Sequence, residues 1–344
     1  MTGNVPGSPR FIMRHSSDSE PGITRERKGK AWAYFTPDGQ RITDRGEIDR
    51  LNAIGLPPAY ENAWFCTDAE GHLQATGVDA RGRKQYRYHA DYTAKRSASK
   101  FDGLKEFGKA LPKLRRRVEK DLRHRNMDRE TVLAAVIRLL DTGFIRVGNE
   151  QYARDNKSFG ATTLRTRHLR RKGRKMLMRF TGKHGIVHEL TLTDSHLKRV
   201  VGRCQDLPGQ MLFQYVNGDG EPRPVTSSDV NDYIRETMGG DFTAKHFRTW
   251  GASVIAMEQL LKKAESARMT VKTMIEPVAE ALGNTEAMSR KSYVHPRLIE
   301  AVKEDARDPL DGLDRPRARK RLSSTEVALI QYLSKRKRRR QAQA

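Results

Sequence analysis

The pattern of hydrophobic residues changes near residue 95, and this change constrains the fold more than any other feature of the sequence. Before it, from Ala31 to about Tyr92, short alternating or aromatic runs such as AWAYF and LQATGV are separated by turn residues, which is typical of β-strands. After it, apolar residues recur with helical spacing, as they do from Asp128 to Leu140. A chain of 344 residues is long enough for two compact units. We therefore expect an α+β protein with a small β-rich N-terminal domain and a mainly α-helical second domain.

One β-hairpin is expected to interrupt the helical part of the chain. Alternating apolar residues run from Met176 to Phe180 and again from Ile186 to Leu192, and the turn sequence TGKHG lies between them. This arrangement places Lys183 at the tip of the hairpin. Further helices are predicted at about 194–206, 227–239, 242–265 and 269–282, and a last one after the capping box Ser323-x-x-Glu326.

The chain is predicted to divide into four segments. The lead, residues 1–25, mixes charges with Ser, Gly and Pro and is expected to be disordered, without the apolar core of a signal peptide. A β-rich domain spans 26–95, and a mainly helical domain spans 96–335. The boundary is placed in the polar, lysine-rich stretch 93–104. A basic tail, 336–344, ends the chain.

The charge of the chain indicates a polyanionic partner. Sixty-six Lys and Arg residues oppose 42 Asp and Glu, which gives a formal net charge of +24, and nucleic acid is the first candidate for such a surface. No stretch approaches the roughly 18 apolar residues of a membrane-spanning helix. The two cysteines, Cys66 and Cys204, lack the spacing of a zinc site or a disulfide framework, which fits a reduced cytoplasm.

Two arginines suggest phosphodiester chemistry when they are considered together. Cleavage of a phosphodiester needs a nucleophile, cations for the phosphoryl oxygens and a proton for the departing oxygen. Arg146 lies in FIRVGNEQY, after the end of an apolar helix, and Arg248 lies early in a long helix, one turn after Lys245. Two rigid guanidiniums can clamp one phosphate. Because a single arginine in so basic a chain is usually a solvated surface charge, only the combination is informative.

A second feature lies in the β-rich domain, in the sequence DARGRKQYRYHADY. Alternation places Tyr86 and Tyr88 on one face of a strand. Such tyrosines are more often half-buried packing residues, but here basic residues interleave with them, which favours contact with nucleic acid. These basic residues are Arg81, Arg83, Lys84 and Arg87.

Cofactor motifs are not found in the sequence. There is no Walker sequence and no G-x-G-x-x-G after a strand, and no carboxylate cluster suited to magnesium lies near the basic motifs. We therefore expect neither a metal nor a nucleotide cofactor.

Five sequence stretches resemble the catalytic domain of type IB topoisomerases, particularly the small poxvirus-like and bacterial enzymes, and more distantly the tyrosine recombinases. They are FIRVGNEQY, FGATTLRTRHL, RFTGKHGIVHEL, KHFRTW and LGNTEAMSRKSYVHP. They occur in the order and with the spacing of that family, and the resemblance runs from about residue 28 to residue 300. It implies the fold of the DNA breaking and rejoining enzymes.

The resemblance also implies a role for each catalytic residue. Arg146 and Arg248 would hold the non-bridging oxygens of the scissile phosphate, and Lys183 would protonate the departing 5′ oxygen. Tyr293, in S-x-x-x-Y after an expected helix start at SRKSY, would attack phosphorus and become linked to the 3′ phosphate. Where most relatives carry a histidine nine residues before the tyrosine, this chain has Asn284. Asparagine does not transfer protons at physiological pH, so it would stabilise charge while Lys183 does the acid–base work.

The resemblance predicts double-stranded DNA as the partner of a chain that acts as a monomer and closes on the duplex as a clamp. It would relax supercoils of either sign without ATP, in the nucleoid of a bacterial cytoplasm. The alternatives are a tyrosine recombinase, which usually has an HxxR box where this chain has Lys245-x-x-Arg248, and a non-catalytic DNA-binding protein. The predicted DNA-binding residues are Gln85, Tyr86, Tyr88, Tyr152 and Lys245.

Overall fold

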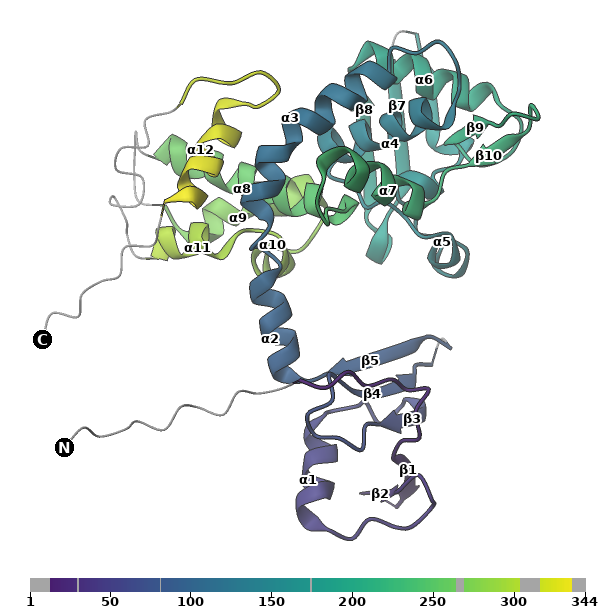
Figure 1. Cartoon of the computed structure of the whole chain (residues 1–344), viewed down its shortest axis with the longest axis vertical. Helices are drawn as coiled ribbons and strands as arrows, with labels where there is room; N and C mark the ends of the chain where they lie inside the picture. The colour runs from purple at the N-terminus through teal and green to yellow at the C-terminus, as the bar shows by residue number, and fades with distance from the viewer. Residues whose placement is uncertain are drawn as a thin grey trace, which may run out of the picture. The chain divides into compact units, whose positions relative to one another are not determined.

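The computed structural model describes residues 13–29, 31–80, 82–173, 175–263, 269–303 and 316–335. The chain divides into two compact units, Met1–Asp102 and Gly103–Ala344, and each is described by itself. The predicted α+β class is confirmed (Figure 1). The domain boundary predicted near residue 95 falls inside helix α2 (Ala90–Ser99). The predicted tail 336–344 and the first twelve residues of the predicted lead lie outside the described residues.

Two small antiparallel sheets and two helices make up the first unit. Strands β1 and β2 form one sheet, and the other has the order β3-β4-β5. The polar segment between β2 and β3 contains a helix, α1. Its N-terminal cap is Asp44, whose side chain accepts a hydrogen bond from the Glu47 amide at 2.7 Å. The bounds are β1 Thr24–Lys28, β2 Ala31–Phe35, α1 Arg45–Ala53, β3 Glu61–Phe65, β4 Leu73–Val78, β5 Lys84–Tyr88 and α2 Ala90–Ser99.

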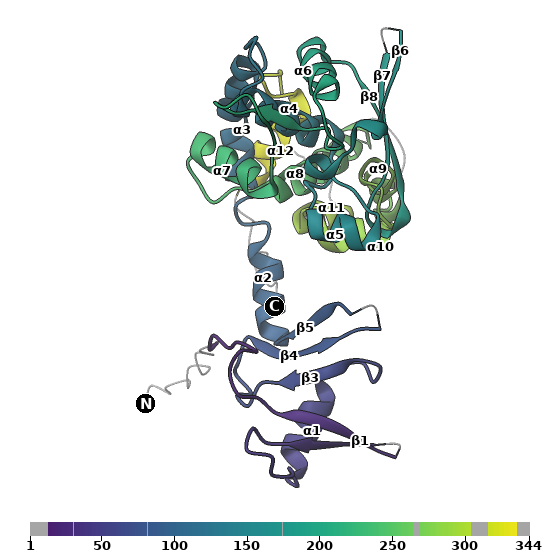
Figure 2. The same ribbon diagram turned by 90° about the vertical axis from the view of Figure 1, so that its right-hand side faces the viewer.

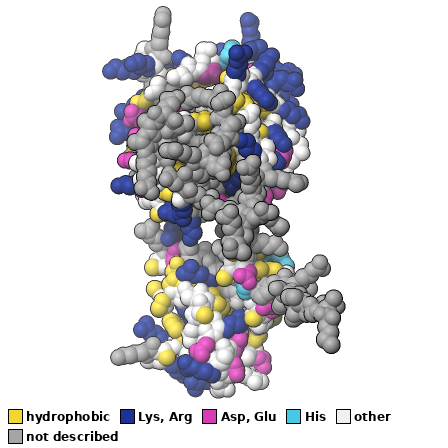
Figure 3. Space-filling model, turned by 90° about the vertical axis from the view of Figure 1, so that its left-hand side faces the viewer, with side chains coloured by type: hydrophobic (Ala, Val, Ile, Leu, Met, Phe, Trp, Pro, Cys, Tyr) yellow, Lys and Arg dark blue, Asp and Glu magenta, His cyan; other side chains and the backbone are white. Residues whose placement is uncertain are grey.

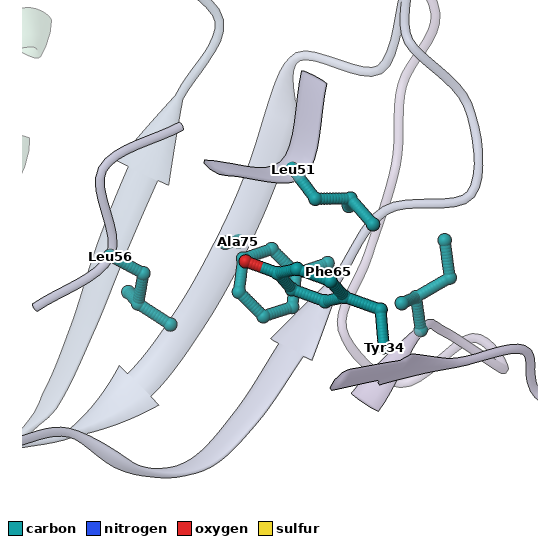
Figure 4. Close-up of a cluster of buried hydrophobic side chains, with 6 residues drawn as sticks. Tyr34, Leu51, Leu56, Phe65 and Ala75 are labelled. Atoms are coloured by element: carbon teal, nitrogen blue, oxygen red, sulfur yellow. The ribbon is translucent and has the colours of Figure 1, made fainter. Parts of the chain in front are cut away.

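The core of the first unit lies where α1 and the strands meet (Figure 4). Tyr34 and Phe65 pack edge to face with ring centroids 5.5 Å apart, and Leu51 of α1 and Ala75 of β4 complete the cluster. The Tyr34 hydroxyl donates to Asn52 Oδ1 at 2.9 Å, so its polar end is satisfied inside the core. Burial raises the pKa of Tyr34.

The chain before β1 is more structured than the predicted disordered lead. Ser16 is 5% exposed, and its hydroxyl donates to the Leu73 carbonyl at 3.0 Å. The Trp64 indole donates to the Glu20 carbonyl at 2.9 Å. These contacts fix residues 13–23 to the sheet β3-β4-β5, which corrects the prediction for that part of the lead. Composition alone missed the segment, because isolated residues, and not a periodic run, make the contacts.

The second unit is mainly helical and contains the predicted hairpin (Figures 1 and 2). Strand β7 pairs with β8 over the register Met176 to Leu192, and β6 pairs with the other edge of β7. The helices predicted at 194–206, 227–239, 242–265 and 269–282 are confirmed as α6, α7, α8 and α9. The bounds are α3 Leu104–Asp121, α4 Arg129–Gly143, α5 Glu150–Asn156, β6 Leu169–Lys172, β7 Lys175–Thr181, β8 Val187–Leu192, α6 Ser195–Asp206, β9 Gln214–Val216, β10 Pro222–Pro224, α7 Ser227–Met238, α8 Ala244–Lys263, α9 Val271–Leu282, α10 Glu286–Ser292, α11 Pro296–Lys303 and α12 Ser324–Ser334.

Side-chain caps start several of these helices where the sequence predicts. Asp128 accepts from the Thr131 amide at 2.8 Å at the start of α4. The Glu326 amide donates to the Ser323 hydroxyl at 3.2 Å, and the Ser323 amide donates to the Glu326 carboxylate at 2.8 Å, so the capping box of α12 is confirmed. Among the described residues, no helix is both long and apolar enough to span a membrane.

A buried ion network joins the helices of the second unit. Arg115 of α3 donates to both Asp141 oxygens at 2.8 Å and to Glu326 Oε1 at 2.8 Å. The Trp250 indole of α8 donates to the same Glu326 oxygen at 3.0 Å. Burial would raise the pKa of Glu326, but Arg115 and Trp250 outweigh that effect and lower it. The network therefore fixes α3, α4 and α12 to α8, the helix that carries Arg248.

Replacing Arg115 with alanine is expected to lower the free energy of unfolding by about 3–5 kcal/mol, because two buried carboxylates lose their counter-charge. Urea denaturation followed by circular dichroism measures the change. The exposed neighbour Arg116 is the matched control, and Arg116→Ala should cost less than about 0.5 kcal/mol. Equal losses in the two variants would contradict the role given to the network.

Candidate active site

Arg248 lies at the centre of the predicted catalytic residues. Its side chain comes from the second turn of α8 and is 3% exposed. One terminal nitrogen donates to the Phe144 carbonyl at the end of α4, and the other donates to the Leu282 carbonyl at the end of α9, at 3.0 Å. Carbonyls at a helix end lack partners within the helix and carry partial negative charge. One guanidinium therefore ties two helix ends together.

Arg146 is positioned by the end of α4, the first of these two helix ends. Phe144 caps α4 in the left-handed conformation, and the chain then turns so that the Arg146 carbonyl accepts from the Ala161 amide at 2.8 Å. A Cβ on Gly160 would lie 2.5 Å from that carbonyl oxygen, so only glycine permits this backbone approach. The FGATT stretch thus has a structural task, which is to hold the backbone of Arg146.

Asn284 is positioned by the end of α9, the second of these two helix ends. Gly283 ends α9 with φ +58°, and Asn284 follows it. The Asn284 side-chain oxygen accepts a hydrogen bond from Arg146 Nη2 at 3.1 Å. Residues 138 positions apart in the sequence therefore meet at the point that Arg248 organises.

Tyr293 follows the end of α10, and the helix start predicted at SRKSY is wrong. Helix α10 begins earlier, because Thr285 caps it by accepting from the Met288 amide at 3.2 Å. The Arg248 guanidinium carbon lies 4.9 Å from the centroid of the Tyr293 ring, within the range of a cation–π interaction. The fully buried Ser253 hydroxyl lies 2.9 Å from the Thr249 carbonyl and 3.4 Å from the Tyr293 carbonyl, and it accepts a hydrogen bond from the His295 amide at 3.1 Å. The backbone on both sides of the phenol is thus fixed to α8.

Two hydrogen-bond donors at this site have no acceptor among the described residues. They are Arg248 Nε and Asn284 Nδ2, and both atoms are shielded from solvent. Buried polar groups in folded proteins are nearly always hydrogen-bonded, so two such donors at one site are suited to a ligand that accepts hydrogen bonds. An oxyanion with several oxygens, such as a phosphodiester, provides the acceptors that these groups lack.

Lys183 lies in the short 3-10 turn Lys183–Gly185 between β7 and β8 and is exposed, as predicted for the hairpin tip. The Gly182 amide donates to the Ile186 carbonyl at 2.7 Å, which closes the turn. The turn also approaches the Asn284 segment, because a Cβ on Gly283 would lie 3.3 Å from Ile186 Cγ2. In Figure 2 the β7–β8 hairpin is seen beside α9 and α10.

The site is strongly positive, and burial together with this charge lowers the pKa values of two groups, Arg248 and His188. Burial lowers the pKa of Arg248, and the charge of Arg146 lowers it further, while Tyr293 opposes the shift. Burial also lowers the pKa of His188 on β8, and the charges of Arg248 and Arg146 add to that effect. An anion at the site would relieve the repulsion between the two guanidiniums.

Two further predicted residues belong to the second unit. Lys245 is exposed in the first turn of α8, one turn before Arg248, and Tyr152 is half-buried in α5. In Figure 3, many Lys and Arg side chains are seen around the margins of the helical unit. Among the described residues, no group of three His, Cys, Asp or Glu side chains is arranged to hold a metal ion.

Strand β5 of the first unit presents the predicted tyrosines as expected, but not Gln85. Tyr86 and Tyr88 are 49% and 44% exposed, and their rings stack with centroids 6.3 Å apart. Gln85 points to the other face, where its amide donates to Asp79 Oδ2 at 2.9 Å. Alternation thus separates the glutamine from the tyrosines with which it was grouped. Arg81 lies outside the described residues.

The segment before β1 reaches the tyrosine face of this sheet. Lys84 lies on the same face as Tyr86 and Tyr88, and its ammonium forms an ion pair with Asp18. Thr76, which pairs with Tyr86 across the strands, also hydrogen-bonds the Asp18 carboxyl, and these contacts, with Lys84 the largest, lower the pKa of Asp18. An acidic side chain therefore occupies part of the predicted DNA-facing surface.

Several residues that build the site had no role in the sequence analysis. Ser253 and the carbonyls of Phe144 and Leu282 act through the backbone, and such contacts leave no local pattern in a sequence. His188 did carry a signal: it takes an inward position in the alternating run from Ile186 to Leu192, where an apolar residue is typical.

Comparison with protein families identifies the two units separately. Residues 87–311 match the family described as eukaryotic DNA topoisomerase I, catalytic core. Residues 31–79 match the family described as bacterial DNA topoisomerase IB, N-terminal domain. The first match covers more than half of the chain and includes all five predicted catalytic residues.

Individual relatives agree with the family matches. The chain is 33% identical to a DNA topoisomerase 1B of Acanthamoeba polyphaga mimivirus, over 79% of this chain and 85% of the relative. It is 24% identical to a DNA topoisomerase 1 of Rabbit fibroma virus, over 67% and 72%. It is 22% identical to the DNA topoisomerase 1B of Vaccinia virus strain Copenhagen, over 79% and 90%. These matches do not favour the recombinase or the non-catalytic alternative.

Proposed function

Because this chain belongs to the type IB DNA topoisomerase family, we propose that it cleaves and reseals one strand of duplex DNA through Tyr293. The proposed reaction forms a 3′-phosphotyrosyl intermediate, allows the downstream duplex to rotate and then restores the strand. Since the phosphodiester energy is conserved in the tyrosine link, the cycle needs no ATP.

One observation carries the proposed assignment of the site. Arg248 Nε and Asn284 Nδ2 are buried donors without an acceptor among the described residues, and they belong to the side chains that contact Tyr293 and Arg146. A scissile phosphate bound here would accept from both donors and receive the charge of both guanidiniums. It would also lie close to the phenol, which is the geometry that nucleophilic attack requires.

The cleavage step is a transesterification at phosphorus. The Tyr293 phenolic oxygen forms a bond to phosphorus, and the bond from phosphorus to the 5′ oxygen breaks. The phenolic proton leaves to solvent, and Lys183 gives a proton to the departing 5′ oxygen. In the reverse step the 5′ hydroxyl attacks the phosphotyrosine and Lys183 takes its proton back, while the bond from phosphorus to the Tyr293 oxygen breaks and that oxygen regains a proton from solvent.

The two arginines would stabilise the extra negative charge of the transition state. A free phenol has a pKa near 10 and is a weak nucleophile at neutral pH, so a field that favours phenolate character matters. Arg248 supplies it directly, because its guanidinium lies against the Tyr293 ring. Asn284 adds a hydrogen bond without transferring a proton, which assigns general acid catalysis to Lys183.

We also propose how the protein engages DNA. Its two units would close around the duplex as a clamp, with Tyr86, Tyr88, Tyr152 and Lys245 among the groups that contact DNA and Gln85 released from Asp79 to read a base edge. One chain suffices as a monomer, because the second unit alone carries the five catalytic side chains. The proposed location is the nucleoid of a bacterial cytoplasm.

Mapping the covalent adduct tests this proposal. Supercoiled plasmid is mixed with the protein and denatured with detergent, and the complex is then digested with nuclease and trypsin for mass spectrometry. The expected product is the peptide containing Tyr293 with a nucleotide attached through its 3′ phosphate. An adduct on another residue, attachment to a 5′ phosphate, or no adduct at all would contradict the proposal.

Replacing Asp18 with asparagine is expected to tighten DNA binding by a factor of about two to five, because the ion pair with Asp18 no longer competes for Lys84. Fluorescence anisotropy with a short duplex at several salt concentrations measures the affinity. One additional phosphate contact should also steepen the log–log salt dependence by about 0.9. Asp38→Asn, the same charge change in a turn between β2 and α1, is the control. Equal effects of the two variants would contradict a local role for Asp18.

A further inference from the structure

The imidazole ring of His188 lies between the two glycines that precede Lys183 and Asn284. A Cβ on Gly182 would lie 2.6 Å from His188 Cδ2 and 2.7 Å from Nε2. A Cβ on Gly283 would lie 2.7 Å from His188 Cε1. Real Cβ atoms do not approach other atoms this closely, so both backbones contact the ring directly. The ring therefore fills the space between the Lys183 turn and the Asn284 segment.

The ring has little freedom to move from this position. Phe180 pairs with His188 across β7 and β8, and the two rings stack with centroids 5.2 Å apart and planes 19° apart. Phe180 is itself buried. Held by Phe180 on one strand and by glycine backbone on both sides, the imidazole sets the separation between the hairpin tip and the end of α9.

We propose that His188 is a positioning residue, whose ring holds the Lys183 turn against the Asn284 segment so that Lys183 reaches the departing 5′ oxygen. This inference rests on the proposed function, because it concerns the reach of the general acid. His188 lies just after the five-residue connection 182–186 that joins β7 to β8, so its ring sets the direction of the exposed Lys183 in that turn. General acid catalysis is sensitive to such placement, since the donor must come within hydrogen-bond distance of the leaving oxygen.

This role depends on the shape of the ring and not on its protonation. Burial disfavours a positive charge on His188, and the charges of Arg248 and Arg146 act in the same direction, so its pKa is lowered. The neutral imidazole fits between the glycines without adding a third cation to the site. A flat ring of similar size without a titratable nitrogen should therefore replace it.

The test compares His188→Ala with His188→Phe in single-turnover cleavage of two DNA duplexes. One duplex carries the ordinary 5′ oxygen at the cleavage site, and the other carries sulfur, which leaves without a proton. His188→Ala is expected to cleave the oxygen substrate about 10- to 100-fold more slowly than wild type and to recover most of that loss on the sulfur substrate. His188→Phe is expected to remain within about threefold of wild type on both substrates.

Two further variants separate positioning of Lys183 from a general loss of packing. In the Lys183→Ala background, His188→Ala should slow oxygen cleavage by less than about threefold, because the group that it positions is gone. Gly182→Ala has an unstrained φ of −92° but pushes against the same ring, so it should show the same recovery on sulfur. If circular dichroism shows that His188→Ala does not fold, Gly182→Ala still tests the inference.

Specific outcomes would overturn the inference. His188→Ala cleaving the oxygen substrate within threefold of wild type would do so, as would equal losses on both substrates or additive effects with Lys183→Ala. Loss of activity in His188→Phe equal to that of His188→Ala would assign the role to the nitrogen atoms instead. If wild type cleaves neither duplex, the proposed function falls and the inference falls with it, whereas intact wild-type cleavage isolates the failure to His188.

Discussion

Replacing Tyr293 with phenylalanine is expected to slow plasmid relaxation by at least about 10⁴-fold, because the nucleophile of a covalent mechanism is removed. The substitution deletes one oxygen atom and leaves the ring, whose centroid lies 4.9 Å from the Arg248 guanidinium carbon. The packing of the site should therefore persist. Relaxation is followed on agarose gels over a range of enzyme concentrations.

Two controls separate chemistry from folding in this variant. The duplex affinity of Tyr293→Phe should stay within about threefold of wild type, since no phosphate contact depends on the hydroxyl alone. Tyr215→Phe removes the hydroxyl of a half-buried tyrosine on β9 and should relax plasmid within about twofold of wild type. Undiminished relaxation by Tyr293→Phe would identify another nucleophile and refute the assignment.

Replacing Lys183 with alanine is expected to slow strand cleavage by about 10²- to 10⁴-fold, the usual contribution of general acid catalysis. The loss should largely disappear when the 5′ leaving oxygen is replaced by sulfur, because a thiolate leaves without a proton. Single-turnover cleavage of a duplex with a mapped cleavage site measures both rates.

Lys175 provides the matched control for this second variant. It is an exposed lysine on the same hairpin, at the far end of β7. Lys175→Ala removes the same charge, so it should change binding modestly and should show no difference between the oxygen and sulfur substrates. A Lys183→Ala variant that is equally slow on both substrates would transfer the general acid role to another group, and Lys245 would be the next candidate.

Much of the second unit could be predicted from its sequence because local signals specify it. Asp128 and Ser323 are capping residues that indicate the starts of α4 and α12. The alternation of apolar and polar residues on either side of Lys183 indicates the hairpin. Capping and periodicity involve residues three or four positions apart, and a sequence displays these relations directly. The start of α10 differs from the one predicted at SRKSY, because Thr285, which lies before that stretch, caps the helix.

The first unit was harder to predict because its order depends on long-range contacts. Ser16 is buried by hydrogen bonds to residues more than fifty positions away, and nothing in the neighbouring sequence indicates this. Gln85 appeared to belong with Tyr86 because both lie in one basic stretch. The strand instead turns it toward Asp79. Charge composition indicates a DNA-binding surface but does not resolve which face of a strand forms it.

At the candidate active site, the sequence predicts which residues act together, but it does not show how they are assembled. The family pattern placed roles on Arg146, Arg248, Asn284 and Tyr293. They meet because Arg248 binds two carbonyls at helix ends. Every residue has a backbone carbonyl, so the sequence does not indicate which carbonyls bind Arg248. The same holds for His188, whose importance follows from two glycine contacts separated by about a hundred residues.

We propose that this chain relaxes DNA at the Arg248 site through a phosphotyrosine intermediate that conserves the energy of the phosphodiester bond. The test is relaxation of positively and negatively supercoiled plasmid with EDTA present and without any nucleotide. Wild-type protein is expected to relax both plasmids fully through a ladder of topoisomers. Relaxation of only one sign, or a requirement for a divalent metal ion or ATP, would contradict it.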